Sequence, residues 1–233
     1  MRQSMEAITI IVPVKDEEVG LQYLLDNYQK SDLEERFDIR FIFVIDQRTS
    51  DSSKKYASKF SDNIIDQKDT TGKGAAVSQA VSLWKKDPTE MAIFLDADGS
   101  YSFDSVSSVI MELKEGSDIV SGSRFLGHGG RPKGMSILHY VGNRLLSFFS
   151  SIRNRRKISD LCTGLWGFRE EALMKLNFQS SGFDLEAEIS GLSRRFSLNH
   201  QEVKVEWSQR KGGISKLRSI SDGLIIFFRI IRT

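Results

Sequence analysis

The sequence predicts an α/β fold in which a mostly parallel central sheet has helices on both faces. Two observations carry this prediction. From residue 8 to residue 121, segments with the pattern of buried strands alternate with segments of helical spacing, an order that is typical of parallel sheets. Polar residues follow most of these strand segments, as expected where a ligand binds beyond the carboxyl ends of the strands.

The first strand is predicted at residues 8–14, where a nearly continuous β-branched run indicates burial on both faces. Residues 17–28 follow as a helix because their apolar positions recur at helical spacing. The same patterns predict further strands at 40–45, 63–66, 91–95 and 118–121, and helices at 50–60, 74–86 and 103–114.

The second half of the chain is predicted to contain fewer strands. Its strands are expected at 165–168 and 200–207, and its helices at 135–152, 170–176, 184–196 and 214–231. The chain has 233 residues but only three prolines and no low-complexity tract. We therefore expect a single domain over residues 1–233, long enough to bury a substantial core.

Cysteine usage and the N-terminus suggest a reducing compartment. The single cysteine, Cys162, excludes an intrachain disulfide and a cysteine-based zinc cluster. The polar start of the chain, and the charged residues 15–18 that interrupt its first apolar run, do not have the pattern of a signal peptide. We expect a cytoplasmic location, peripheral at the inner face of the membrane for the reasons given below.

Two aspartates, Asp96 and Asp98, directly follow the apolar run 91–95. Residues at i and i+2 of a strand point to the same side, so both carboxylates could reach one site. Mg²⁺ and Mn²⁺ prefer oxygen ligands, and Mg²⁺ usually takes one or two carboxylates together with substrate phosphates. The pattern predicts a metal that holds a nucleotide diphosphate; a capping turn made of Asp and Gly is the alternative.

Cations follow other predicted strands at the same sheet edge. Lys73 lies between two glycines before a helix, where it could reach an anion. Arg124 follows Gly122-Ser123, and its planar guanidinium could clamp a phosphate. An ordinary loop lysine and a solvated surface arginine are the alternatives.

The whole chain has a formal net charge of +2, but residues 119–159 contain eight Lys and Arg and no acidic residue. Such a block calls for an anionic partner. Residues 134–157 and 214–233 combine large apolar side chains with bases, which favours amphipathic helices at a membrane surface. Neither segment contains the roughly 20 apolar residues that are needed to span a bilayer. Ordinary core-facing helices with solvated basic ends are the alternative.

Several other classes of protein are disfavoured. The sequence lacks G-x-G-x-x-G after the first strand and a Walker A motif around Lys73, which argues against a Rossmann dehydrogenase and a P-loop NTPase. It also lacks G-x-S-x-G and H-E-x-x-H. No nucleic-acid-binding module can be recognised around the basic run 155–157, so we expect no nucleic acid as partner.

From about residue 8 to about residue 217, the chain closely resembles glycosyltransferase family 2, and within it the dolichyl-phosphate or polyprenyl-phosphate sugar synthases. The resemblance rests on eight motifs in the family's order: 11–18, 46–51, 72–76, 96–98, 122–124, 159–169, 183–188, and Arg210 with 215–217. The chain departs from the family pattern at Gln47-Arg48, where Asp-Gly is usual, and at Leu165-Trp166, where Phe-Arg is common.

The resemblance implies the GT-A fold and metal-dependent, inverting transfer of a hexose from a GDP- or UDP-sugar to a polyprenyl (dolichyl) phosphate. Such a phosphate monoester has a second pKa of about 6, so it is an anionic nucleophile at neutral pH and needs no strong base.

The implied site residues fall into four overlapping groups. Asp96 and Asp98 would bind Mg²⁺ or Mn²⁺. The nucleotide pocket would contain Pro13, Lys15, Glu17, Asp46, Lys73, Asp96, Ala97 and Asp98. The catalytic group would be Asp96, Asp98, Asp160 and Arg124. The acceptor phosphate would meet Arg124, Arg131, Arg210 and Lys216.

Two other functions remain open from the sequence. One is a family 2 enzyme with a soluble or glycan acceptor, which would not need apolar basic helices. The other is a non-catalytic subunit that binds a nucleotide sugar or lipid phosphate, with a membrane subunit as its partner. The sequence does not decide between GDP and UDP.

Overall fold

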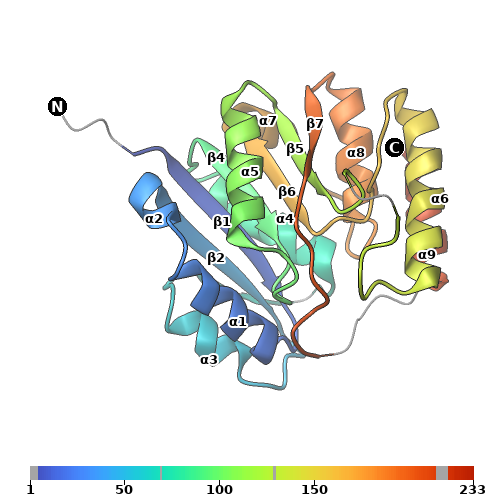
Figure 1. Cartoon of the computed structure of the whole chain (residues 1–233). Helices are drawn as coiled ribbons and strands as arrows, with labels where there is room; N and C mark the ends of the chain where they lie inside the picture. The colour runs from blue at the N-terminus through green and yellow to red at the C-terminus, as the bar shows by residue number, and fades with distance from the viewer. Residues whose placement is uncertain (1–4, 69, 128–129, 214–219) are drawn as a thin grey trace.

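A seven-stranded sheet forms the centre of the computed structural model, which describes residues 5–68, 70–127, 130–213 and 220–233 (Figure 1). Its strands are β1 (Ala7–Val14), β2 (Asp38–Asp46), β3 (Ile64–Gln67), β4 (Met91–Leu95), β5 (Ile119–Ser123), β6 (Leu165–Arg169) and β7 (His200–Lys204). They lie in the order β3-β2-β1-β4-β6-β5-β7. Only β6 runs antiparallel to its neighbours β4 and β5, so the predicted mostly parallel sheet is confirmed.

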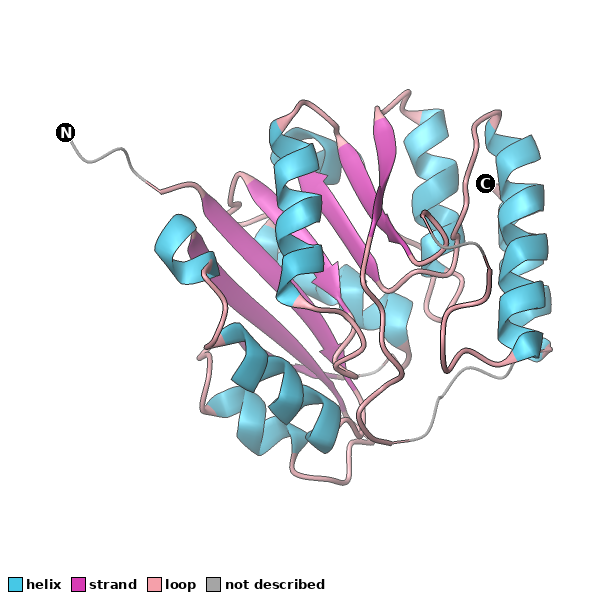
Figure 2. Cartoon of the chain, in the orientation of Figure 1, coloured by secondary structure: helices cyan, strands magenta, loops and turns pink. Residues whose placement is uncertain are grey.

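Helices cover both faces of this sheet (Figure 2). Those described are α1 (Glu18–Tyr28), α2 (Leu33–Arg36), α3 (Ser53–Ser58), α4 (Lys73–Trp84), α5 (Phe103–Lys114), α6 (Ile137–Asn154), α7 (Glu170–Lys175), α8 (Leu185–Arg195) and α9 (Ser221–Arg232). One core cluster packs α1 and α5 on the sheet, and a second packs α4, α7 and α8 on the opposite face.

The strands bury both faces because successive side chains point in opposite directions. In β1, Ile8 and Ile10 belong to the core under α1 and α5, whereas Ile11 belongs to the core under α4. All three side chains are fully buried. The continuous β-branched run at the start of the chain is thus explained by burial on two sides.

Several predicted boundaries are wrong. The helix predicted at 50–60 begins only at Ser53, because Asp51 accepts hydrogen bonds from the backbone N–H of Ser53 and of Glu18, both at 2.9 Å. The strand predicted at 200–207 ends at Lys204, and Trp207 instead forms an isolated bridge with Tyr101. The short helix α2 was not predicted. The start of the predicted helix 214–231 lies outside the described residues, and α9 begins at Ser221.

α6 and α9 pack together beside α8, at one edge of the molecule (Figure 1). The rings of Phe149 and Phe227 meet edge to face at 5.1 Å between centroids. Leu146, Ile226 and Ile230 are buried in the cluster that these helices form with α8. Within the described part of the chain, no helix combines the length and the apolar character needed to cross a membrane.

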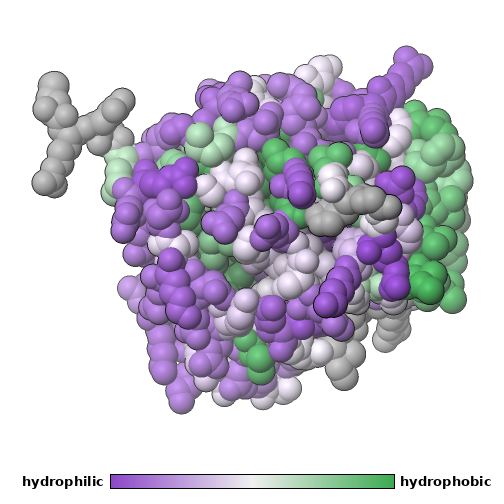
Figure 3. Space-filling model, in the orientation of Figure 1, coloured by the Kyte–Doolittle hydropathy of each residue, from purple (hydrophilic) through white to green (hydrophobic). Residues whose placement is uncertain are grey.

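The outward face of these two helices is apolar (Figure 3). We call it the α6/α9 face, and it comprises the exposed side chains of Ile137, Leu138, Val141, Leu145, Phe148, Ile152, Leu224, Ile225, Phe228 and Ile231. The buried face of α6 is mostly polar: Asn143, Ser147, Ser150 and Asn154 point inward. This arrangement is the reverse of an ordinary surface helix, which turns its apolar stripe toward the core.

Candidate active site

A cavity of about 1020 Å³ opens at the carboxyl edge of the sheet. This is where ligands bind in open α/β sheets. Ten of the residues predicted for the site line it: Pro13, Lys15, Glu17, Asp46, Lys73, Asp96, Ala97, Asp98, Arg124 and Arg210. They come from the ends of β1, β2, β4 and β5, from the start of α4, and from the segment after β7.

Two other predicted residues do not line this cavity, and a third cannot be placed. Asp160 is buried beneath it, with no exposed side-chain surface. Arg131 donates a hydrogen bond to the Met135 carbonyl and so fixes the segment that leads into α6. Lys216 lies outside the described residues.

Asp96 is held by a cation in the cavity wall. The Lys73 ammonium lies 2.6 Å from Asp96 Oδ1 and donates to Glu186 Oε1 at 2.7 Å. Burial by itself lowers the pKa of Lys73, but the two carboxylates outweigh burial and hold that pKa above its ordinary value. Gly164 leaves the room that Asp96 needs, since a Cβ on Gly164 would lie 1.9 Å from Asp96 Oδ2.

Asp98 is fixed by the backbone on both sides. Its Oδ1 accepts a hydrogen bond from the Ser100 N–H at 3.0 Å, and its carbonyl accepts from the Lys211 N–H at 3.0 Å. Arg210 pairs with Glu17 and brings Nη1 to 4.0 Å from Asp98 Oδ2. The segment after β7 therefore lines the cavity and contacts the aspartate turn directly.

The two aspartates fit a divalent cation that a substrate helps to hold. Their side chains remain 31% and 20% exposed to the cavity for Asp96 and Asp98. Among the residues that the structure describes, no group of three or more His, Cys, Asp or Glu side chains could hold a metal ion. Carboxylate oxygens completed by phosphate oxygens are the ligands that Mg²⁺ usually takes, so the donor set suits such an ion.

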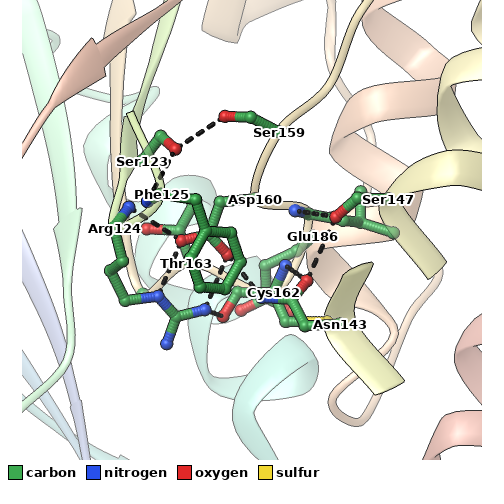
Figure 4. A network of polar contacts seen from close by, with 12 residues as sticks. Ser123, Arg124, Phe125, Asn143, Ser147, Ser159, Asp160, Cys162, Thr163 and Glu186 are labelled. Atoms are coloured by element: carbon green, nitrogen blue, oxygen red, sulfur yellow. Dashed lines mark hydrogen bonds and ion pairs between the residues drawn. The ribbon is translucent and has the colours of Figure 1, made fainter. Parts of the chain in front are cut away.

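A buried hydrogen-bond network anchors Arg124 (Figure 4). Its Nε and Nη2 donate to the two Asp160 oxygens, each at 2.7 Å, and its backbone N–H donates to Oδ2 at 2.9 Å. Asn143 of α6 donates to Oδ1 at 2.6 Å. Asp160 is thus fully occupied, and it acts on the cavity through Arg124.

Arg124 keeps donors for a ligand. Its Nη2 also donates to the Cys162 carbonyl at 2.7 Å, whereas its Nη1 has no hydrogen bond with any residue in the described ranges. Burial lowers the pKa of Arg124, but the Asp160 carboxylate outweighs burial and holds that pKa above its usual value. A fixed guanidinium at the cavity wall is suited to clamp a phosphate.

Cys162 also lines the cavity but is not a nucleophile at neutral pH. Burial, with the nearby carboxylates of Glu186 and Asp160, raises the pKa of its thiol to about 12. The thiolate is the reactive form of cysteine, so this thiol stays protonated and inert.

Asp46 is occupied by the arginine that departs from the family pattern. Arg48 donates from its backbone N–H and Nε to Asp46 Oδ1, both at 2.9 Å, and from Nη2 to Oδ2 at 2.7 Å. These side-chain hydrogen bonds lower the pKa of Asp46 to about 2, although burial acts in the opposite direction. Arg48 remains half exposed at the cavity.

The glycines around Lys73 serve a packing role. The N–H groups of Gly74 and Ala75 donate to the carbonyls of Gly182 and Ser181, at 3.1 and 3.2 Å. A Cβ on Gly72, whose φ is +100°, would lie 2.3 Å from the Ser181 carbonyl oxygen. The close backbone approach that these glycines allow is made to residues 181 and 182, and two N–H groups at this helix end are already engaged.

Sequence reasoning missed three residues of the site. Glu186 lies within the 183–188 motif, and Arg48 is part of the departure from the family pattern at 46–51. Both positions could therefore have been recognised from the sequence, but no role was predicted for either. Asn143 had none, because it lies on the inward face of α6 and meets Asp160 only in the folded chain.

The fold and site together define a glycosyltransferase of the GT-A fold. The sequence profile described as glycosyl transferase family 2 matches residues 9–176, and the chain belongs to this family. It is an enzyme that takes its sugar from a nucleotide-sugar donor.

Two curated relatives cover nearly the whole chain. The glycosyltransferase AglJ of Haloferax volcanii is 26% identical over 228 residues, which cover 97% of this chain and 72% of that protein. The UDP-N-acetylglucosamine–dolichyl-phosphate N-acetylglucosaminyltransferase of Methanococcus voltae is 22% identical over 244 residues, which cover 96% of this chain and 94% of that protein.

A solved enzyme shares the fold. Glucosyl-3-phosphoglycerate synthase from Mycobacterium tuberculosis, in complex with phosphoglyceric acid, superposes with a TM-score of 0.74 at 16% identity, over 97% of this chain and 79% of that one. Its complex with Mn²⁺, UDP-glucose and phosphoglyceric acid gives a TM-score of 0.71 at 15% identity, with the same coverage. At this identity the likeness establishes the GT-A fold alone.

Proposed function

We propose that the protein transfers a sugar from a nucleotide-diphosphate sugar to a polyprenyl phosphate at a membrane surface, with the help of a divalent cation. One observation carries this proposal. The cavity runs without interruption from the charged residues at the sheet edge to apolar residues between α6 and α9. A single site therefore offers one end for a charged donor and another for a lipid chain.

The donor end lies around Asp96 and Asp98. There the two carboxylates would hold Mg²⁺ or Mn²⁺, and the bound cation would supply positive charge to stabilise the leaving nucleotide diphosphate. Pro13, Lys15 and Asp46 line the adjoining part of the cavity, where we place the nucleoside. The M. tuberculosis enzyme was solved in complex with Mn²⁺ and UDP, and with Mn²⁺ and UDP-glucose, which supports this donor chemistry.

The acceptor phosphate binds beside Arg124. The Asp160 carboxylate and the Cys162 carbonyl fix two guanidinium nitrogens, so the group is held in place before the acceptor arrives. A preorganised cation of this kind lowers the barrier to reaction because it needs no reorganisation. The phosphate oxygen attacks the anomeric carbon, the nucleotide diphosphate leaves, and inversion is expected from the family.

The lipid chain lies between α6 and α9. This part of the cavity is lined by Leu138, Leu145, Leu146, Phe149, Leu224, Ile226 and Phe227. Apolar side chains of this kind stabilise a bound hydrocarbon by removing its surface from water. The name of the M. voltae relative specifies dolichyl phosphate as acceptor, which supports the same acceptor class here.

The α6/α9 face would lie against the membrane. Its exposed large side chains, such as Leu145 and Phe148, form a contiguous apolar edge (Figure 3), and exposed patches of this kind mark interaction sites. Arg144, Arg155 and Lys157 are exposed on or next to α6, as suits contact with anionic head groups. We propose the cytoplasmic, inner face of the membrane as the location, with the protein peripheral to it.

The acceptor assignment predicts a specific transfer reaction. Incubated with a panel of UDP- and GDP-sugars and Mn²⁺ or Mg²⁺, the protein is expected to convert polyprenyl phosphate into a lipid-linked sugar, because the cavity holds both substrates. The product is checked by extraction into organic solvent and mass spectrometry. Free phosphate monoesters without a lipid tail serve as the comparison. Turnover with a soluble or glycan acceptor alone would refute the lipid assignment, and nucleotide-sugar binding without any turnover would indicate a non-catalytic subunit.

The membrane assignment predicts loss of vesicle binding when the α6/α9 face is made polar. The double variant Phe148→Asp/Ile152→Asp changes two exposed residues of α6 that do not line the cavity. It is expected to bind vesicles of mixed anionic and neutral lipid at least about 100-fold more weakly, because burial of two such side chains, each contributing about 1.5–3 kcal/mol, is lost. Flotation at low salt measures this binding.

A matched control changes exposed apolar residues elsewhere. Leu83 on α4 and Met174 on α7 are also exposed, so Leu83→Asp/Met174→Asp should bind vesicles as the wild type does. Equal binding by both double variants would contradict the membrane contact. Failure of the wild type to bind lipid, together with self-association through this face, would point to a protein partner such as a membrane subunit or a second copy.

A further inference from the structure

Glu186 is a buried carboxylate in the cavity wall to which no role has so far been given. It stands in the first turn of α8, and its side chain is only 8% exposed. Its partner is Lys73 of α4, at 2.7 Å, and the same ammonium lies 2.6 Å from Asp96. One lysine therefore bridges two carboxylates, of which one is proposed to bind the divalent cation.

A cation at Asp96 and the ammonium of Lys73 compete. Both are positive, and two unit charges a few ångströms apart in a protein site repel strongly. The ammonium can relieve this repulsion by moving away from Asp96 toward its other carboxylate partner, which already lies 2.7 Å from it.

Glu186 is that partner. It lies on a separate element from Asp96, in helix α8, and it already accepts a hydrogen bond from Lys73. Burial raises the pKa of Glu186, and Lys73 only partly offsets this. A buried carboxylate of this kind gains most by keeping a cation close.

We propose that Glu186 is a positioning residue that draws Lys73 away from Asp96 when the divalent cation binds, and thereby sets the affinity for that cation. This inference rests on the proposed function, because it takes the cation at Asp96 and Asp98 from it. Glu186 acts through Lys73 and does not itself contact the ion.

A double-mutant cycle on Lys73 and Glu186 tests this relation. The wild type, Glu186→Gln, Lys73→Gln and the double variant are each titrated with Mn²⁺ in the presence of saturating UDP or GDP. Electron paramagnetic resonance distinguishes free from bound Mn²⁺. This measurement reports cation affinity directly and does not depend on turnover.

We expect Glu186→Gln to weaken Mn²⁺ binding by about 10-fold, because Lys73 is left with Asp96 as its remaining carboxylate partner. Lys73→Gln should tighten Mn²⁺ binding, because the competing cation is gone. In the Lys73→Gln background, the further change Glu186→Gln should alter the affinity by less than about twofold. Glu171→Gln, which removes an exposed carboxylate of α7 outside the cavity, is the control and should bind as the wild type does.

The inference is overturned if Glu186→Gln weakens Mn²⁺ binding equally with and without Lys73, since Glu186 would then act on the ion directly. If Glu186→Gln does not fold, Glu186→Asp replaces it. Weaker Mn²⁺ binding by Glu186→Asp than by the wild type supports the inference. Mn²⁺ binding equal to that of the wild type, or tighter, would overturn the inference.

Failure of the proposed function is recognised separately. If the wild type binds Mn²⁺ but transfers no sugar to polyprenyl phosphate, the proposed acceptor is refuted and the cycle still reports on Glu186. If the wild type binds no Mn²⁺ with either nucleotide, both the proposed cation and the role of Glu186 are refuted.

Discussion

Sugar transfer is expected to fall by about 10²- to 10³-fold when Asp98 is replaced by asparagine, the loss typical of removing one preorganised group that stabilises developing charge. Asparagine keeps the shape of the side chain and the Oδ1 that accepts from the Ser100 N–H. It removes the negative charge that is proposed to hold the cation. Initial rates measured over a Mn²⁺ titration check this result, and the Mn²⁺ concentration for half-maximal rate should rise.

The matched control is Asp104→Asn, an exposed aspartate in the first turn of α5. It does not line the cavity, so its transfer rate should equal that of the wild type. If Asp98→Asn keeps the wild-type rate and metal dependence, the assignment of Asp98 as a metal ligand is refuted. An equal loss in both variants would show that the assay responds to net charge alone.

The second large effect is expected from Asp160→Asn. The carboxylate is buried and is the counter-ion of Arg124, whose side chain is only 12% exposed. Removing one partner of a buried pair typically costs about 3–5 kcal/mol, because the other charge is left uncompensated. For a chain of this size such a loss lowers Tm by roughly 6–20 °C, which calorimetry measures. Transfer should also be lost, because Arg124 is no longer fixed.

A double variant separates stability from function at this pair. In Arg124→Gln/Asp160→Asn both charges are gone and the two amides can still hydrogen-bond, so its Tm should lie above that of Asp160→Asn. It should nevertheless remain inactive, since the acceptor phosphate meets no guanidinium. A Tm no higher than that of Asp160→Asn, or recovery of transfer, would contradict the role assigned to the pair.

The strands at the centre of the sheet could be predicted closely because their signal is local. β4 was predicted at its observed bounds, 91–95, since a short apolar run that ends in Asp96 and Asp98 has one plain interpretation. The shorter helices could not be predicted as well. The late start of α3 depends on the side chain of Asp51, which also contacts the N-terminus of α1. The helix propensity of residues 50–60 contains no information about that contact.

The cavity residues divide in the same way. Lys15, Asp46 and Asp96 follow strands, and parallel strands bring their carboxyl ends to one edge, so their common location follows from topology alone. Asp160 was predicted to be catalytic and Arg131 to contact the acceptor phosphate, whereas in the structure they bond to Arg124 and to the Met135 carbonyl. Arg124 is 36 residues from Asp160 in the chain, and the contact of Arg131 depends on the local turn that precedes α6, so the sequence pattern predicts neither partner.

For this protein the sequence alone determined the order of the strands and of the longer helices, the aspartate turn after β4 and the basic, apolar character of residues 134–157. Each is encoded in residues that are neighbours in the chain. Only the tertiary structure decided that Lys73 bridges Asp96 and Glu186, that Asp160 lies beneath the cavity, and that α6 turns Asn143 inward and Phe148 outward. These features depend on which groups meet when separate elements pack, because burial and pairing of charges are properties of the folded chain and not of any segment in it.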